Sequence, residues 1–440
     1  MRVTASVVAW LPVINAASFV PADTTGTDKL ARKALQNVRL RASGHTPASY
    51  DQPQPLVNKV LSTLTHRLGL RTAHEQQQHE ARDDKDQPRC TIKTASVRRE
   101  WDSLKSDEKT AYVDAVLCLM DKPPISGDLA PGARSRYDDF SATHINQTLS
   151  IHGTGSFLSW HRYFTWTYEQ ALRQECGYRG VFPYLNWGKY ALDLLNAPIF
   201  DGSSTSLSGN GCRDDRNNGT NIPSNDLPFI VLSGGQGGGC VTSGPFANFT
   251  VNLGPMAPAL AYITPNPQKD GLGHNPRCLR RDIGAHAAKT WSKDSDAHAL
   301  ITQSPHIGAF QTTMQGDFAS GFLGIHAAGH FFTGGDPGGD LFSSVGDPFF
   351  YLQHAQIDRM WWIWQNYLDV TGKKNGVEGG EGDRLYVVAN TTTVNNSPPS
   401  RNVTLDDVVQ LGLNDLNGAE GITIRDAADT LAGPFCYIYE

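Results

Sequence analysis

Two widely separated segments of this sequence combine histidines with aromatic residues in a helical pattern. The first segment, HGTGSFLSWHRYFTWTYE, runs from His152 to Glu169 and contains a second histidine, His161. After His161, apolar side chains recur at the spacing of one helical face, which predicts that His161 opens a helix. His152 is then expected in the glycine-rich loop before that helix. His144 lies eight positions upstream of His152, at the end of another expected helix.

The second cluster lies far downstream. The segment GIHAAGHFF places His326 and His330 four positions apart, so both imidazoles lie on one face of a helix. The segment DPFFYLQHAQIDRMWW supplies His354, with Asp358 one turn later. A lone histidine is usually a surface or core residue, but two matched groups of three indicate metal binding, because neutral imidazole is a common metal ligand. The predicted ligand sets are His144, His152 and His161, and His326, His330 and His354.

The spacing of these residues resembles that of the type-3 binuclear copper proteins, which include tyrosinases, catechol oxidases and haemocyanins. One family signature reads H-x4-F-x2-[FW]-H-R-x6-E, and the other reads D-P-x-F-x3-H-x3-D. The matching residues are His152, Phe157, Trp160, His161, Arg162 and Glu169, and Asp347, Pro348, Phe350, His354 and Asp358. The resemblance extends from Cys90 to the end of the chain. It implies a mainly α-helical fold, with an antiparallel four-helix bundle around a dicopper site, long loops and a few short β-strands.

The resemblance also implies a reaction. Two Cu(I) ions can deliver a pair of electrons to dioxygen, and three imidazoles per ion leave an open face for oxygen and substrate. Enzymes of this family oxidise o-diphenols to o-quinones while dioxygen is reduced to water, and tyrosinases also hydroxylate monophenols. We therefore expect a copper-dependent oxidoreductase with two copper ions as its cofactor, dioxygen as co-substrate and small phenols as substrates.

Three residues near the second ligand set bear on which of these reactions occurs. Monophenol hydroxylation requires a deprotonated phenol. Many tyrosinases have Asn directly after the first histidine of the second set and a Glu upstream, which together hold a water molecule. Here Ala327 follows His326, and Gln315 and Asp317 stand upstream. We therefore expect diphenol oxidation, as in catechol oxidases, with a full tyrosinase, an o-aminophenol oxidase and a haemocyanin-like oxygen carrier as the alternatives.

Asp358 is the predicted supporting residue of the second ligand set. It lies one helical turn after His354, where a carboxylate can accept a hydrogen bond from a ligand imidazole and orient it. An ion pair with Arg359 or a backbone cap is an equally good interpretation of the same position.

Charge and hydropathy exclude two classes of partner. The net charge is −6 and charged residues make up 19% of the chain, so no basic surface for nucleic acid is expected. Beyond the N-terminus, no run of 18 apolar residues indicates a membrane span. The oligomeric state is left open by these patterns.

The chain divides into three predicted segments. Residues 1–18 have a basic start and an apolar stretch from Val3 to Ala17, which is typical of a secretory signal peptide. Residues 19–89 form an N-terminal segment with a helix predicted over 28–41 and a polar stretch at 66–89 that is expected to be disordered or removed by processing. Residues 90–440 are the predicted copper-binding catalytic domain.

Cysteines and glycosylation motifs favour a secreted glycoprotein. The chain has seven cysteines, an odd number that leaves one thiol unpaired. Cys212 and Cys240 flank a segment rich in glycine and asparagine, and we predict that they form a disulfide. The predicted glycosylation sites are Asn218, Asn248, Asn390, Asn395 and Asn402.

Overall fold

The computed structural model describes residues 19–43, 90–224, 227–368, 384–389, 401–412 and 421–440. The predicted signal peptide, the polar stretch at 66–89 and the predicted glycosylation sites Asn390 and Asn395 lie outside the described residues. Within the described residues, Asn218, Asn248 and Asn402 are exposed.

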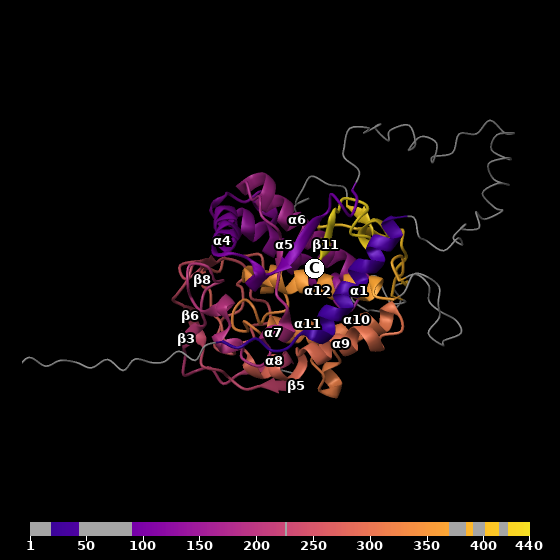
Figure 1. Ribbon diagram of the computed structural model, residues 1–440. Coiled ribbons are helices and arrows are strands. Elements are labelled where there is room, and N and C mark those ends of the chain that lie inside the picture. The colour runs from indigo at the N-terminus through magenta and orange to yellow at the C-terminus, as the bar shows by residue number, and fades with distance from the viewer. Residues whose placement is uncertain (1–18, 44–89, 225–226, 369–383, 390–400, 413–420) are drawn as a thin grey trace, which may run out of the picture.

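The fold is mainly α-helical with a few short strands, as predicted (Figure 1). The longer helices are α1 (Thr25–Ala42), α4 (Ser106–Asp121), α5 (Arg136–Ile151), α6 (Phe157–Cys176), α9 (Asp294–Gln303), α10 (Ile307–Gln315) and α12 (Phe349–Asn366). The shorter helices are α7 (Trp187–Tyr190), α8 (Ala285–Trp291), α11 (Gly324–His330) and α13 (Ile424–Ala428). Among the described residues, no helix has the length and apolar character needed to cross a lipid bilayer.

Local sequence signals explain where the histidine-bearing helices begin and end. At the start of α5, the Ser135 hydroxyl accepts a hydrogen bond from the backbone N–H of Asp138, whose carboxylate accepts one from the backbone N–H of Ser135. Helix α6 ends at Gly177, whose φ of 68° lies in the left-handed region that glycine tolerates best. Before α12, the carboxylate of Asp347 accepts a hydrogen bond from the backbone N–H of Phe349.

Two helix boundaries differ from the prediction at the first ligand set. Helix α6 begins at Phe157, so His161 lies one turn inside the helix instead of opening it. The buried side chains of Phe157, Leu158 and Trp160 supply the apolar contacts that extend the helix upstream. His152 directly follows α5 as its C-terminal cap residue. The predicted helix over residues 28–41 is present as α1, slightly longer at both ends.

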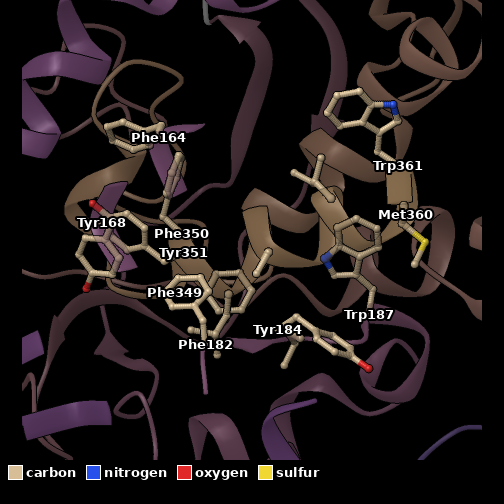
Figure 2. Packing of buried hydrophobic residues seen from close by; sticks show 14 of the residues in the cluster. Phe164, Tyr168, Phe182, Tyr184, Trp187, Phe349, Phe350, Tyr351, Met360 and Trp361 are labelled. Atoms are coloured by element: carbon tan, nitrogen blue, oxygen red, sulfur yellow. The ribbon is translucent and has the colours of Figure 1, made fainter. Parts of the chain in front are cut away.

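Helix α12 forms the centre of the core. All of its residues are buried, as expected for a helix surrounded by other elements on every side. Figure 2 shows the aromatic side chains at its N-terminal end: Phe350 and Tyr351 lie against Phe164 and Tyr168 of α6. Close packing of these rings holds the two helices that carry His161 and His354 at a fixed separation.

Helix α1 packs directly on α12 and α9 (Figure 1). Ala31, Ala34 and Val38 belong to the same buried cluster as α12. The side-chain amide of Asn37 donates hydrogen bonds to the backbone carbonyls of Asn366 and Leu368, each at 2.8 Å. The predicted domain boundary at Cys90 therefore leaves out a helix that shares the core of the folded domain.

The strands are short, and most form isolated pairs. They are β1 (Ser96–Glu100), β2 (Pro183–Tyr184), β3 (Gly211–Arg213), β4 (Thr220–Ser224), β5 (Leu227–Leu232), β6 (Gly238–Val241), β7 (Thr250–Val251), β8 (Arg277–Cys278), β9 (Val408–Val409), β10 (Ile422–Thr423) and β11 (Tyr437–Tyr439). The three-stranded sheet has the order β11-β1-β2, with parallel pairing throughout. This sheet brings the C-terminal strand beside the beginning of the domain.

The disulfides differ from the predicted pairing. Cys240 is bonded to Cys278, and Cys212 is an exposed free cysteine, so the predicted Cys212–Cys240 bridge is wrong. Strand β6 lies between β3, which carries Cys212, and the segment around Cys278, where the backbone N–H of Val241 donates to the carbonyl of Leu279. Cys240 therefore has a cysteine on either side, and its bond goes to Cys278. The other disulfides are Cys90–Cys436 and Cys118–Cys176.

Candidate metal centre

The first three histidines converge as predicted. His144 is on α5, His152 directly follows that helix, and His161 is on α6. Their ring centroids lie 4.9 to 5.8 Å apart. One ligand nitrogen from each ring lies within 4.8 Å of the other two, close enough for a single metal ion to bind all three.

The second three histidines also converge. The Nε2 atom of His330 lies 3.1 Å from that of His326 and 3.3 Å from that of His354. The two sets face each other across the bundle, because the rings of His161 and His354 stack with their centroids 4.5 Å apart, and those of His152 and His326 lie 5.8 Å apart. Helices α5, α6, α11 and α12 thus bring six imidazoles into one buried site.

Backbone carbonyls orient the first set. Each Nδ1 atom lies 2.7 to 2.9 Å from a carbonyl oxygen: His144 contacts Phe342, His152 contacts Thr148 and His161 contacts Phe157. Because a carbonyl oxygen can only accept, Nδ1 carries the proton and Nε2 keeps its lone pair. The Nε2 atoms of His144 and His161 are buried without a hydrogen-bond partner, which is costly unless a metal ion takes the lone pair.

Burial also keeps the six imidazoles neutral. Desolvation lowers the pKa of His152 to about 4 and that of His330 to about 3. The same cause lowers the pKa values of the other four well below the ordinary histidine value. Neutral imidazole is the form that binds transition metals, so this donor set fits two copper ions.

Two phenylalanines separate the imidazoles from the rest of the core. The ring of Phe157 contacts the rings of His161 and His326, each with centroids 4.9 Å apart. The ring of Phe350 stacks on His354 at 4.1 Å and also contacts His144 and His330. Both phenylalanines are buried, so they fix the ring positions and exclude water from the core side of the imidazoles.

Asp358 does not contact His354. Its carboxylate accepts hydrogen bonds from Arg162 at 2.5 Å and from the hydroxyls of Tyr437 and Tyr439 at 2.6 Å each. Arg98 lies within 3.3 Å of the same carboxylate. Burial opposes ionisation of Asp358, but Arg162 and Arg98 outweigh it and lower its pKa. The expected hydrogen bond from His354 is therefore absent, and the partners of this carboxylate are Arg162, Arg98 and the two tyrosines, not Arg359 or a backbone N–H.

The three residues expected to decide between diphenol oxidation and monophenol hydroxylation have distinct environments. Gln315 lines the cavity above the histidines, and its side-chain oxygen accepts a hydrogen bond from the backbone N–H of Gly153 at 2.7 Å. Ala327 lines the same cavity. Asp317 is exposed and does not line the cavity, so its carboxylate cannot serve as the base considered for this position.

Two supporting residues were not singled out as site residues from the sequence. Gln353, directly before His354, donates a hydrogen bond to the backbone carbonyl of His326 and so links α12 to α11. The buried carboxylate of Asp340 accepts hydrogen bonds from the backbone N–H groups of Phe342 and Ser343. An aspartate whose side chain accepts from a backbone N–H two residues later is a local turn signal that the sequence can show. The connection from this turn to His144, through the carbonyl of Phe342, can be seen only in the folded structure.

A cavity of about 710 Å³ opens above the histidines. His152, His326 and His330 lie at its base, and its walls come from β4, from the segments 256–265 and 338–344, and from Gln315, Gly316 and Phe318. An organic molecule of moderate size therefore has access to both ligand sets.

Comparison with known proteins identifies the family. The family model described as the common central domain of tyrosinase matches residues 134–367. This chain belongs to the tyrosinase family. Tyrosinase P from Aspergillus terreus is 37% identical over 355 residues, which cover 80% of this chain and 93% of the relative. N-acetyl-6-hydroxytryptophan oxidase from Emericella nidulans is 37% identical over 366 residues, which cover 81% and 95%.

A solved structure supports the same assignment. A mutant of a polyphenol oxidase from Thermothelomyces thermophila superimposes with a TM-score of 0.75 and 38% sequence identity, covering 94% of this chain and 98% of that one. As a tyrosinase family member with a polyphenol oxidase fold, this protein is a copper oxidoreductase.

Proposed function

We propose that this protein oxidises o-diphenols to o-quinones, with dioxygen reduced to water. The observation that supports this most strongly is the pair of histidine sets that face each other beneath an accessible cavity. In this proposal His144, His152 and His161 hold one copper ion, and His326, His330 and His354 hold the other. When bound, the copper pair would supply the transfer of electrons from two diphenols to one dioxygen, yielding two quinones and two waters.

The residues of the chain prepare the site for this reaction. The carbonyl contacts of the first set direct three Nε2 lone pairs toward one point, so little rearrangement is required when copper binds. Phe157 and Phe350 keep water away from the side of the imidazoles that faces the core, which strengthens electrostatic interactions there. The substrate's ring enters through the cavity, where His152, His326 and His330 are accessible.

Three observations favour diphenol oxidation over monophenol hydroxylation. The side chain of Ala327 offers no hydrogen-bonding group that could hold a water molecule. The amide of Gln315 cannot act as a base, and its oxygen is already bonded to Gly153. Asp317 is exposed and outside the cavity. Hydroxylation therefore has no group at these positions to take up the phenol proton.

Oxygen uptake by the copper-loaded protein tests this proposal. We expect rapid uptake with catechol and little with phenol under the same conditions. Equal, lag-free uptake with both would instead identify a tyrosinase. Uptake with o-aminophenol and not with catechol would identify an aminophenol oxidase. Reversible oxygen binding without turnover would identify a carrier.

A double variant probes the missing base directly. Gln315→Glu keeps an acceptor for the Gly153 N–H, and Ala327→Asn adds an amide beside His326. Together they should raise the ratio of phenol to catechol oxidation by about tenfold, since a positioned base commonly contributes 10²–10⁴-fold in full. Asp317→Glu is the matched control, because its side chain lies outside the cavity and the ratio should not change.

We also propose that the protein is exported and glycosylated. Three disulfides are typical of proteins that mature in an oxidising compartment. Asn218, Asn248 and Asn402 are exposed and can be reached by the glycosylation machinery. Mass spectrometry of protein secreted by the native host would show the N-terminus and the modified asparagines.

A further inference from the structure

The cavity above the histidines is larger than one phenol ring requires. Pockets of about 300–1,000 Å³ typically enclose ligands of drug size, and this cavity measures about 710 Å³. Side chains near its base and along one wall are small: Ala257, Ala259 and Ala261 come from the segment 256–265, and Ala327 lies beside His326. A ring at the histidines therefore leaves most of the cavity for a substituent.

The remaining wall is predominantly apolar. Ile222 on β4 faces the cavity together with Met256 and Ile263 of the 256–265 segment, and Phe318 closes another side. Burying CH₂ groups or a second ring against such side chains strengthens binding in proportion to the apolar area removed from water. The wall therefore favours a bulky hydrocarbon or aryl substituent.

The described residues of the cavity wall supply no cationic side chain for an acidic substituent. None of these residues is Lys or Arg. The one carboxylate among the described lining residues, that of Asp340, is only 1% exposed and accepts hydrogen bonds from the backbone N–H groups of Ala257, Phe342 and Ser343. A carboxylate on the substrate would lose water without gaining a cationic partner, which is unfavourable.

We propose that the preferred substrates are o-diphenols that carry a bulky, uncharged and largely apolar substituent. This inference rests on the proposed diphenol oxidation and adds the substrate class. The ring lies at the histidines, and the substituent lies between β4 and the 256–265 segment.

A substrate series tests the inference. We expect kcat/KM to rise at least about tenfold from catechol to 4-hexylcatechol, since each buried CH₂ contributes roughly fourfold. The methyl ester of 3-(3,4-dihydroxyphenyl)propionic acid should exceed the free acid by at least about tenfold, although the two molecules are nearly the same size. Equal values for catechol and 4-hexylcatechol, or for the ester and the acid, would overturn the inference.

Two substitutions at one position locate the substituent. Ala261 lines the cavity and is exposed in a turn, so a larger side chain there should not disturb folding. Ala261→Trp should lower kcat/KM for 4-hexylcatechol about fivefold and leave catechol within about twofold. Ala261→Arg should raise kcat/KM for the free acid about threefold. Ala319 is exposed in the short 3-10 helix Phe318–Ser320 and does not line the cavity, so Ala319→Trp and Ala319→Arg are the matched controls.

A binding measurement separates failure of this inference from failure of the proposed function. Meta-diphenols cannot form a quinone, so calorimetry with 4-hexylresorcinol and resorcinol reports on the cavity without turnover. Copper-loaded protein should bind 4-hexylresorcinol at least about tenfold more tightly, and Ala261→Trp should abolish the difference. If no diphenol is oxidised but this binding difference is found, the proposed reaction is wrong and the cavity assignment stands. Equal binding of both compounds would overturn the cavity assignment itself.

Discussion

Asp340 influences the first ligand set through the backbone. Its carboxylate holds the N–H groups of Phe342 and Ser343, and the carbonyl of Phe342 accepts the Nδ1 proton of His144 at 2.7 Å. Burial raises the pKa of Asp340, although its backbone hydrogen bonds oppose this effect. One carboxylate thus fixes the turn at Phe342, and the Phe342 carbonyl in turn sets the direction of the His144 imidazole, which is distant in sequence.

Replacing this carboxylate should weaken copper binding. In Asp340→Asn, the amide keeps one oxygen but presents an NH₂ group to backbone donors, so the turn at Phe342 should loosen. We expect the copper affinity to fall by about tenfold, as is common when groups that orient a ligand are lost. Competition with a chromophoric chelator measures this change.

The control for this change is Asp317→Asn, which alters an exposed aspartate outside the cavity. Copper affinity in that variant should equal that of the unmodified protein. An unchanged affinity in Asp340→Asn would show that the Phe342 turn keeps its shape without the carboxylate.

At the scale of elements, a buried charge network joins four of them. Arg98 on β1 contacts Glu169 on α6 at 2.7 Å and Asp358 on α12 at 3.3 Å. Tyr437 on β11 donates to Asp358, and its ring lies under the Arg98 guanidinium at 3.5 Å from its centroid. Charges this deeply buried are tolerated only when each is paired, so the network fixes how the four elements meet.

Asp358 should make stability depend on acidity. Its pKa is lower in the folded protein than its ordinary value of 3.8, so the unfolded chain binds the proton more readily. Its stabilising contribution is therefore complete above about pH 5 and is lost as the pH falls through the folded-state pKa. Asp358→Asn should lower the free energy of unfolding at pH 7 by about 3–5 kcal/mol and flatten its pH dependence below pH 4.

Urea denaturation at several pH values measures both effects. Asp128→Asn changes an exposed aspartate, and its unfolding curve should follow that of the unmodified protein at every pH. If the free energy of unfolding of Asp358→Asn fell with pH below pH 4 as steeply as that of the unmodified protein, the acid sensitivity would belong to other carboxylates.

At the scale of the whole molecule, a disulfide closes a covalent loop from residue 90 to residue 436. Cys90 and Cys436 are separated by 346 positions in sequence and joined by a disulfide, beside the parallel pairing of β1 with β11. The second long-range link, Cys118–Cys176, joins α4 to the end of α6. Disulfides that close long loops restrict the unfolded chain most, so the first should contribute strongly to stability.

Opening that loop should destabilise the domain. We expect Cys436→Ser to lower the free energy of unfolding by about 2–5 kcal/mol, with a clearly lower Tm in calorimetry. Cys212→Ser provides the control, because Cys212 forms no disulfide. A Tm in Cys436→Ser equal to that of the control would show that the sheet alone holds the two ends together.

The sequence predicted the features that depend on local patterns. His326 and His330 lie on one helical turn, and aromatic residues surround His161 and His354, so the helices that carry the histidines could be predicted from local patterns. The meeting of the two histidine sets is implied by the resemblance to the type-3 copper proteins. Features that depend on the pairing of distant segments could not be predicted in this way. Cys240 bonds to Cys278 on one side of β6 and not to Cys212 of β3 on the other side, and Asp358 contacts Tyr437 and Tyr439 because β11 pairs with β1.

Helix α1 lies outside the covalent loop that the Cys90–Cys436 disulfide closes. It precedes Cys90, so the disulfide does not enclose it, and it is held on α12 by buried side chains and by the two hydrogen bonds of Asn37. A cut anywhere between residues 43 and 90 would therefore turn α1 into a separate peptide bound to the domain. The fraction of domains with α1 bound would then depend on protein concentration, as for any ligand. The covalent connection between α1 and the domain would no longer supply a high effective concentration. The thermal stability of a cleaved preparation would consequently rise with protein concentration, whereas that of the intact chain would not.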